Sequence, residues 1–343
     1  MFQFAQRRKL FFLISACVII PGLIAMVYST ITEGTPVQLS IDFTGGTLLE
    51  VSFVENIGEQ DVRDALASYG FDEFVVQRLN PIETDAIDAE DVQQAGSRWQ
   101  IRTENITDAD LTSLKQHLQE EVGEFWSPKS VEEDPNREDA ITSSSVSPTV
   151  GEEVTRAAFL ATLAVAVIVL FFIVWAFRRV PHAFRYGACA IIAMFHDIFV
   201  TLGIMSILGL LFDWEVDALF LTAILTVVGF SVQDSIVVFD RIRENIPKYR
   251  GEEYEVIVNR SVLETIHRSL ATQLNAIFIM IAILLFGGET IRQFIAILLI
   301  GLMSGTYSSI FNAVPLLVAW EKGELPFVNR EAKRKREEAV AAS

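Results

Sequence analysis

The stretch VVGFSVQDSIVVFDRIREN, Val227 to Asn245, reads as a membrane helix that is interrupted near its middle by Gln233 and Asp234. An ionisable side chain inside a bilayer is costly, so a functional role is its default interpretation. A helix cap, a position at the interface and a static ion pair are the structural alternatives. The first two are disfavoured, because apolar residues continue beyond the carboxylate from Ile236 to Phe239.

The composition indicates a membrane protein. Mean hydropathy is +0.37, and 51% of the 343 residues are hydrophobic. A helix needs about 20 apolar residues to cross a bilayer. We therefore expect a polytopic α-helical membrane protein with six transmembrane helices, at Leu10–Thr30, Ala157–Phe177, Tyr186–Phe212, Ala218–Phe239, Ser269–Phe286 and Gln293–Trp320.

The first apolar run follows three basic residues, Arg7 to Lys9, so a cleaved signal peptide is an alternative to a retained anchor. The run is longer than the roughly 7–15 residues of a signal peptide's apolar region, and no clear A-x-A site follows it. This favours a retained helix.

The net charge of −17 is unevenly distributed. Residues 31–153 hold 27 acidic and 7 basic residues, counted along the sequence. Basic residues gather at four other places, which the positive-inside rule assigns to the cytoplasm: the N-terminus, the 178–185 loop, the 240–268 loop and the tail with Lys333–Arg336. The acidic segment and the loops 213–217 and 287–290 are then extracytoplasmic.

Cys17 and Cys189 lie in different apolar runs and predict neither a disulfide framework nor a metal site. No phosphate-binding loop, zinc-type spacing or nucleophile elbow is found. We expect no cofactor, no metal and no enzymatic activity.

The extracytoplasmic segment predicts one small α+β domain. Its expected order is strand, helix, strand, strand, helix, strand, which is a ferredoxin-like arrangement. The elements are Thr47–Phe53, Glu59–Tyr69, Glu73–Leu79, Arg98–Thr103, Asp108–Val122 and Ile141–Val146. Residues 80–97 are interpreted as a flexible acidic insertion, and the acidity of the domain disfavours binding to nucleic acid.

The motif IDFTGG precedes the first strand and includes Asp42, Gly45 and Gly46. Paired glycines permit backbone angles that other residues avoid, so a tight turn into the domain is expected.

Asp234 has candidate partners in the fourth and fifth spans. Ser231 shares its helical face, and Gln233 precedes it. In the fifth span Arg268, Gln273 and Asn275 interrupt an otherwise apolar helix. Arg268 is the candidate cation for an ion pair with Asp234, and its alternative is a boundary arginine that extends to the lipid headgroups.

Two further groups stand out in the third and sixth spans. His196 and Asp197 allow either hydrogen-bonded packing or a proton relay. Gly301 and Gly305 form a GxxxG pattern, which packing between helices explains.

These motifs resemble the SecF family, membrane subunits of the bacterial protein-export machinery. The resemblance rests on the opening stretch, on NRSVLETIHRSLATQ (259–273), on GLMSGTYSSIFNA (301–313), and on IDFTGG and SPTVGEE (147–153) beside the outside domain. It covers about residues 1–320. The chain departs from the family at three places. It has Phe230 where the family commonly has tyrosine and Gln233 where the family commonly has asparagine. The region around Gln273 and Asn275 is commonly rich in threonine in the family.

The resemblance implies a bacterial inner-membrane protein that works with SecD in a six-plus-six-helix assembly similar to RND transporters. That complex uses the proton-motive force to help draw preproteins out of SecYEG. The family's proton-conducting carboxylate and arginine fall on Asp234 and Arg268. His196, Asp197, Gln233, Ser231, Gln273 and Asn275 are then relay or supporting residues.

The resemblance also fixes the expected organisation: a cytoplasmic N-terminus (1–9), a first span (10–30), the outside domain (31–153), a five-helix bundle (154–320) and a basic cytoplasmic tail that meets anionic lipid (321–343). The working hypothesis is that protonation of Asp234 repacks spans four to six and moves the outside domain, with a carboxylate of the partner completing the site. A proton-driven RND-type small-molecule exporter and a purely structural assembly subunit are the alternatives.

Overall fold

The computed structural model describes residues 4–71, 74–79, 96–126, 141–178 and 182–325. It consists of two compact units. One comprises Met1–Gln38 with Ala158–Ser343, and the other comprises Leu39–Ala157. The acidic insertion predicted at 80–97 falls mostly outside the described residues, but Ser97 belongs to a strand. The basic tail at Lys333–Arg336 also lies outside them.

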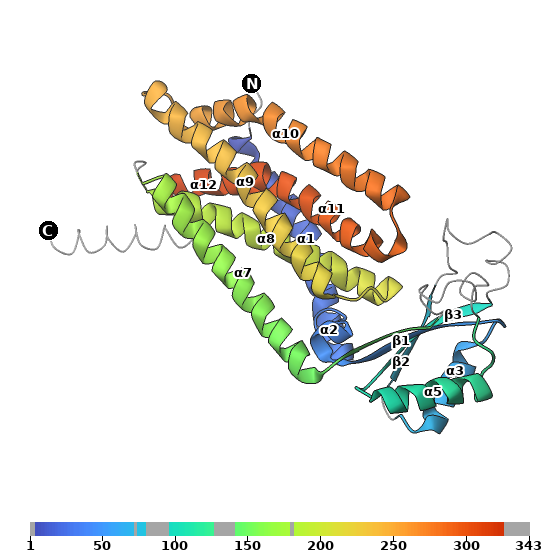
Figure 1. Ribbon diagram of the computed structural model, residues 1–343. Helices are drawn as coiled ribbons and strands as arrows, with labels where there is room; N and C mark the ends of the chain where they lie inside the picture. The colour runs from blue at the N-terminus through green and yellow to red at the C-terminus, as the bar shows by residue number, and fades with distance from the viewer. Residues whose placement is uncertain (1–3, 72–73, 80–95, 127–140, 179–181, 326–343) are drawn as a thin grey trace. The chain divides into compact units, whose positions relative to one another are not determined.

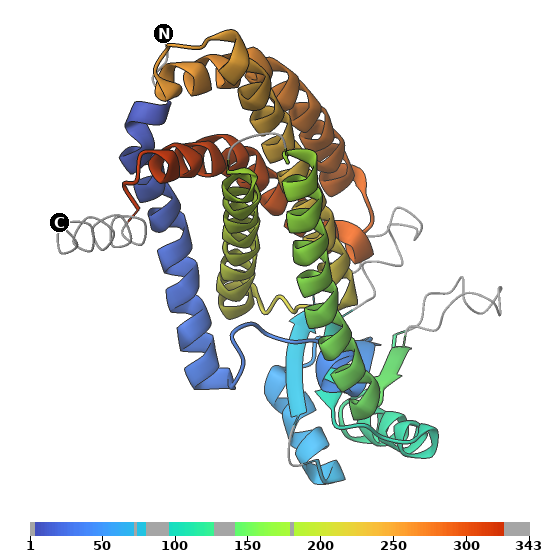
Figure 2. The same cartoon turned by 90° about the vertical axis from the view of Figure 1, so that its left-hand side faces the viewer.

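The first unit is a bundle of long apolar helices (Figures 1 and 2). Six helical segments among the described residues are long and apolar enough to cross a membrane, which confirms the predicted number. The elements are a 3₁₀ turn at Ala5–Arg7 with α1 (Arg8–Glu33), α7 (Pro148–Ala176), α8 (Ala183–Phe212), α9 (Ala218–Lys248), α10 (Tyr254–Phe286), and α11 (Glu289–Ser308) with a π-helical turn (Ser309–Ala313) and α12 (Val314–Glu321).

The fourth and fifth helices are longer than the predicted spans. The segment 240–268, expected to be a loop, is helical except around residues 249–253. Ion pairs stabilise this helical extension: Arg243 binds Asp240 one turn away at 2.6 Å, and Arg241 of α9 binds Glu264 of α10 at 2.6 Å. Charged residues therefore mark where the helices leave the hydrocarbon, not where they end.

Helix α9 is central to the packing, since it contacts α8, α10 and α11 (Figure 1). Helix α1 packs along α8, where Gly22 and Gly203 face each other. A Cβ atom on either glycine would come within 2.7 Å of the other residue's Cα, so only glycine allows this approach.

A group of ion pairs joins the start of α1 to the start of α10 and the end of α12. Arg8 binds Glu255 at 3.0 Å and also binds Glu324, and Lys322 binds Glu255 at 2.5 Å. We call these four residues the terminal clasp. It links the first and last membrane helices at one end of the bundle.

The second unit is a four-stranded antiparallel sheet with two helices. Its elements are α2 (Ile41–Thr44), β1 (Gly46–Phe53), α3 (Glu59–Tyr69), β2 (Phe74–Leu79), β3 (Ser97–Thr103), α5 (Asp108–Glu121) and β4 (Ile141–Val146). The strand order is β2-β3-β1-β4. Alternate residues of β1 and β3, such as Val51 and Ile101, are buried in a core with Leu66 of α3 and Leu118 of α5. The bounds predicted from alternation in the strands and from apolar stripes in the helices agree with the observed bounds to within about one residue.

Candidate functional site

Asp234 lies on the side of α9 that faces α10, and only 5% of it is exposed. Its carboxylate accepts two hydrogen bonds from α10. Ser269 Oγ donates to Oδ1 at 2.9 Å, and Gln273 Nε2 donates to Oδ2 at 2.7 Å. Ser269 and Gln273 are one turn apart and therefore share a helical face. The structure thus brings Asp234 together with Gln273, as the sequence suggested, and adds Ser269.

Arg268 does not form the expected ion pair with Asp234. Its side chain is exposed, whereas the neighbouring Ser269 is buried against Asp234. Consecutive residues of an α-helix point about 100° apart. Because α10 turns Ser269 toward α9, it turns Arg268 away. Asn275 on α10 and Gln233 on α9 are exposed as well.

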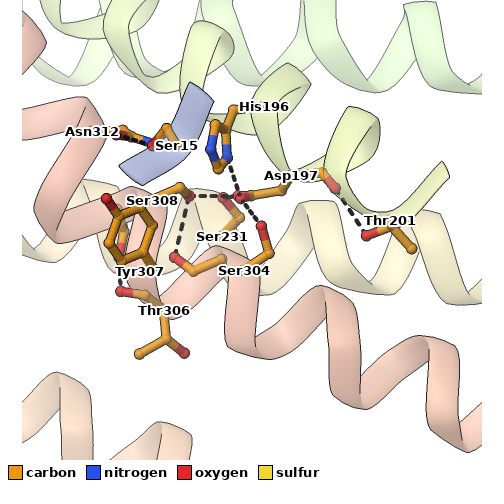
Figure 3. Close-up of polar contacts among 12 residues, drawn as sticks. Ser15, His196, Asp197, Thr201, Ser231, Ser304, Thr306, Tyr307, Ser308 and Asn312 are labelled. Atoms are coloured by element: carbon orange, nitrogen blue, oxygen red, sulfur yellow. Dashed lines mark hydrogen bonds and ion pairs between the residues drawn. The ribbon is translucent and has the colours of Figure 1, made fainter. Parts of the chain in front are cut away.

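A second carboxylate, Asp197 of α8, is fully buried at 0% exposure. Figure 3 shows that side chains from three helices converge on it. Its Oδ2 accepts from Ser231 of α9 at 2.5 Å and from Ser308 of α11 at 2.6 Å. Its Oδ1 accepts from Ser304 of α11 at 2.7 Å. We call Asp197 and these three serines the Asp197 cage.

His196 completes this group, with Nδ1 3.1 Å from Asp197 Oδ1. Its Nε2 is buried and has no hydrogen-bond partner among the described residues. The ring lies beside Tyr307, with the ring centroids 6.4 Å apart (Figure 3).

The π-helical turn follows directly after Ser308. Beside it, Tyr307 donates to the Phe11 carbonyl at 2.9 Å, and Ser15 donates to Asn312 Oδ1 at 2.8 Å. Turns of this kind occur often at functional sites. Here the turn carries polar contacts from α11 to α1.

Gly301 and Gly305 allow α11 to approach α9 closely. A Cβ atom on Gly301 would overlap Val227, and one on Gly305 would lie 3.2 Å from the Ser231 Cβ. Gly305 thus lets α11 approach α9 at the level of Ser231, where Ser304 and Ser308 reach Asp197.

The paired glycines lie in the smaller unit, where α2 meets β1. Gly45 has φ 73° and Gly46 has φ 125°, and both values favour glycine. A Cβ atom on Gly45 would lie 2.7 Å from the Cα of Pro148, the first residue of α7. The expected turn therefore exists, and it also seats the beginning of α7. Asp42 lies in the first turn of α2, which Ser40 caps.

No group of three or more histidine, cysteine, aspartate or glutamate side chains arranged for a metal ion occurs in the described part of the chain. Glu255 of the terminal clasp is buried in ion pairs, whereas Asp197 and Asp234 are buried carboxylates without a cationic partner such as lysine or arginine among the described residues. Each of these two is held by neutral hydrogen-bond donors.

Two family models match this chain. The model described as "Protein export membrane protein SecD/SecF, C-terminal" matches residues 128–323, and the "SecD/SecF GG Motif" model matches residues 34–56. A protein translocase subunit SecF from Anaerolinea thermophila is 43% identical over 94% of this chain and 96% of its own length. The one from Thermobaculum terrenum is 41% identical over 94% of each chain. The chain belongs to the SecD/SecF family of protein-export membrane proteins.

Solved structures of the family agree with this assignment. A crystal structure of SecDF from Thermus thermophilus, a translocon-associated membrane protein, has a TM-score of 0.71 at 28% identity. The match covers 94% of this chain and 39% of that one. A SecDF structure in a super-membrane-facing form has a TM-score of 0.59 at 28% identity. The chain is thus a multi-pass membrane protein of the SecD/SecF type, spanning about two fifths of a SecDF chain.

Three residues that contact the two carboxylates were not predicted from the sequence as site residues. They are Ser269 at Asp234, and Ser304 and Ser308 at Asp197. Ser269 precedes Gln273 by one helical turn, so the spacing alone indicates that both side chains lie on the same face of α10 and can reach the same partner. Ser304 and Ser308 are also one turn apart, but small residues at such spacing usually indicate packing alone. Their role as donors to Asp197 depends on how α8 and α11 pack.

Proposed function

We propose that this chain is the SecF-type subunit of a protein-translocase accessory complex. It pairs with SecD and uses the proton-motive force to promote preprotein translocation through SecYEG and its completion. Its family and its relatives, which are named translocase subunits, support the transport role. The buried Asp234 supports coupling to protons, since a carboxylate at membrane depth is costly to keep without a function.

The observation that carries the proposal is an exposed polar stripe on α9 and α10, beside Asp234. On α9 the exposed residues Thr222, Thr226, Gly229 and Gln233 recur every third or fourth position. On α10 the exposed residues at the same spacing are Arg268, Thr272 and Asn275, and the apolar Ala271 and Leu274 beside them are exposed as well. We call the seven residues other than these last two the polar face.

The polar face lies on one side of the α9–α10 pair. Gln233 precedes Asp234 and Arg268 precedes Ser269, so each stripe is turned about 100° from the contact between the two helices. Because α9 and α10 run in opposite directions, both stripes turn to the same side. Polar groups facing lipid tails are unfavourable, and Arg268 is the most costly of them. A second bundle with matching polar residues is the expected cover, and SecD is the partner whose chemistry fits.

Protonation of Asp234 is the proposed switch. The ionised carboxylate accepts hydrogen bonds from both Ser269 and Gln273, and hydrogen bonds to charged groups contribute roughly 1.5–3 kcal/mol each. Protonation converts one acceptor oxygen into a donor, which weakens the hold on α10. Most of α10 beyond Gln273 is exposed, and within this chain the helix packs mainly against α9 and α11.

Rotation of α10 by roughly a quarter turn would carry Arg268 to the place that Ser269 occupies. The arginine would then pair with Asp234 and favour release of its proton. One charge moved through 100 mV corresponds to about 2.3 kcal/mol, comparable to the hydrogen bonds exchanged. The ion pair expected from the sequence is therefore proposed as the alternate state of the site.

The smaller unit is proposed to be a ferredoxin-like domain outside the cytoplasm. Its strand order β2-β3-β1-β4, with a helix after β1 and another after β3, is consistent with a split β-α-β arrangement. The charge distribution supports an extracytoplasmic position, with both chain ends in the cytoplasm of a bacterial inner membrane. A shift of α10 would then be transmitted to this domain, which meets the emerging preprotein.

The test compares wild type with Asp234→Asn in inverted vesicles that contain SecD and SecYEG. Preprotein translocation is followed with and without an imposed proton-motive force. Asp240→Asn on the same helix is the control, because Asp240 lies beyond the apolar stretch of α9 in an exposed ion pair with Arg243. We expect Asp234→Asn alone to lose the force-dependent part. Full force dependence in that variant would refute the coupling role.

A further inference from the structure

The proposed switch does not use Asp197, although Asp197 is the more deeply buried carboxylate of the bundle. Three serine hydroxyls donate to its two oxygens, and His196 Nδ1 lies within hydrogen-bond distance of Oδ1. A carboxylate offers about four acceptor positions, and the three cage serines together with His196 make four contacts to it. Contacts to both oxygens, from three helices, hold the carboxyl group in one position.

The Asp197 cage fixes two helices at functionally important points. Ser231 lies on α9 three residues before Asp234, so its hydrogen bond holds the stretch that carries the coupling carboxylate. Ser304 and Ser308 form the last turn of α11, and Ser308 directly precedes the π-helical turn. Asp197 thus ties α9 and α11 to α8 at one level of the bundle.

The two carboxylates hold α9 from different sides. Asp234 points to α10, where Ser269 and Gln273 bind it. Ser231 points to α8, where Asp197 accepts its hydrogen. In the described part of the chain, no side-chain hydrogen bond joins the Asp197 cage to Asp234.

The charged and titratable groups near Asp197 are few. His196 contributes from α8 itself, and Tyr307 of α11 lies beside the His196 ring. From α9 the nearest in sequence to Ser231 is Asp234, which is turned to α10. No arginine or lysine forms an ion pair with Asp197 among the described residues. Neutral hydroxyls therefore compensate most of its charge.

We propose that Asp197 is a positioning residue for Asp234. It keeps its hydrogen bonds to the three serines throughout the transport cycle and holds α9 and the last turn of α11 in place, so that α10 moves against a fixed Asp234. This inference rests on the proposed coupling role of Asp234. It assigns Asp197 and the three serines to anchoring and removes Asp197 from the proton path.

The chain offers a matched pair of variants for the test. Ser231 and Ser235 are both buried serines of α9, on either side of Asp234. Ser231 donates to Asp197, whereas Ser235 Oγ has no hydrogen-bond partner in the described part of the chain. Ser231→Ala and Ser235→Ala remove the same atom, and only the first one releases the anchor.

Force-dependent translocation is measured for both variants and for Asp234→Asn between pH 6 and 8, in vesicles with the partner subunits. Small misplacements of reacting groups reduce rates by about 10- to 100-fold. We expect Ser231→Ala to lower the force-dependent rate about tenfold at every pH, leaving the shape of the pH profile unchanged. Ser235→Ala should match wild type, and Asp234→Asn should lose the component entirely.

Asp197→Asn gives the stronger test, since it removes the charge while keeping the shape. As an anchor, it should lower the rate and leave the pH profile unaltered. A loss as complete as that of Asp234→Asn, or a changed pH profile, would identify a relay and overturn the proposal. If this variant fails to accumulate in the membrane, Ser231→Ala and Ser308→Ala carry the test, as each removes one of four bonds.

The results also separate this inference from the proposed function. Equal rates for Ser231→Ala, Ser235→Ala and wild type, with Asp234→Asn inactive, would refute the anchor and leave the coupling role intact. Full force dependence in Asp234→Asn would refute the coupling role, and the positioning role of Asp197 with it.

Discussion

Gln273 of α10 donates a hydrogen bond to Asp234 of α9, with Nε2 and Oδ2 2.7 Å apart. The other amide atom, Gln273 Oε1, is buried and has no partner among the described residues. The side chain thus serves the carboxylate and is otherwise unsatisfied, which is costly in an apolar setting.

Replacing Gln273 by leucine should therefore impair coupling more than folding. The change keeps the bulk and removes the donor, and a hydrogen bond to a charged group is worth roughly 1.5–3 kcal/mol. We expect a fall of about tenfold or more in force-dependent translocation in inverted vesicles. Leu274→Ala is the control, because Leu274 is exposed and adjacent. Similar rates in both variants would show that the amide does not serve Asp234.

Arg268 should be dispensable for the stability of this subunit and essential for transport. Its side chain is exposed and forms no ion pair in the described part of the chain. We expect Arg268→Gln to change the melting temperature of the purified subunit in detergent by less than about 2 °C. Translocation by the assembled complex should lose its force-dependent part. A large loss of stability in the isolated subunit would instead indicate that Arg268 already pairs within it.

The helices and strands were predictable because their signals are local. The alternation of β1 and the apolar stripe of α5 each follow from a few consecutive residues. The Asp197 cage was not predictable in the same way. Its donors come from α8, α9 and α11, and the sequence alone does not say which faces of those helices meet.

The misplacement of Arg268 has a different physical origin. Its charge and its nearness to the level of Asp234 were read correctly, but a helix places neighbouring residues about 100° apart. One residue therefore decides between facing Asp234 and facing outward. Charge complementarity alone predicts Arg268 as the partner of Asp234, but the packing of α10 against α9 makes Ser269 the partner.

Gly45 should tolerate alanine less well than Gly34. Both have positive φ, 73° and 81°. Gly34, with ψ −10°, is left-handed, where alanine costs about 1–2 kcal/mol. Gly45, with ψ 173°, lies in a region essentially restricted to glycine, where strain is about 1–3 kcal/mol. Only at Gly45 would the new Cβ also meet backbone, the Cα of Pro148 at 2.7 Å. We expect Gly45→Ala to accelerate hydrogen exchange in β1 and β3 and Gly34→Ala to leave it near wild type. Equal exchange in the two variants would refute a seating role for the glycine turn.

The terminal clasp should make stability depend on pH in the acidic range. Hydrogen bonding to Arg8 lowers the pKa of Glu324 below its ordinary value of 4.5. A carboxylate with a lowered folded-state pKa stabilises the fold above 4.5, and this contribution is lost as the pH falls through the folded-state value. We expect Glu324→Gln to lower the melting temperature slightly at pH 7, since exposed pairs contribute at most about 1 kcal/mol.

The difference between this variant and wild type should vanish in the most acidic samples, where Glu324 is protonated in both states. Glu253→Gln is the control. Glu253 lies next to the start of α10, is exposed and makes no ion pair within the described residues. A pH-independent effect of Glu324→Gln would mean that its packing matters and its charge does not.

The approach of α11 to α9 offers a test that combines two substitutions. A Cβ atom on Gly301 would overlap the Val227 side chain, so Gly301→Ala forces the helices apart and should cost about 1–3 kcal/mol. Val227→Ala removes the obstructing methyl groups and leaves a small cavity. Together the two changes should be less destabilising than the sum of the single effects, with a coupling energy of about 1 kcal/mol or more.

Gly229→Ala is the matched control for this cycle, since it places the same methyl group within a neighbouring membrane helix. No atom lies within 4 Å of a Cβ built on Gly229. Alanine is also the better helix former by about 1 kcal/mol. The control should therefore be neutral or stabilising when melting temperatures are compared in detergent. Additive effects of the two substitutions would show that the cost of Gly301→Ala arises elsewhere than at the α9–α11 contact. The glycines would then not explain the close approach that brings Ser304 and Ser308 to Asp197.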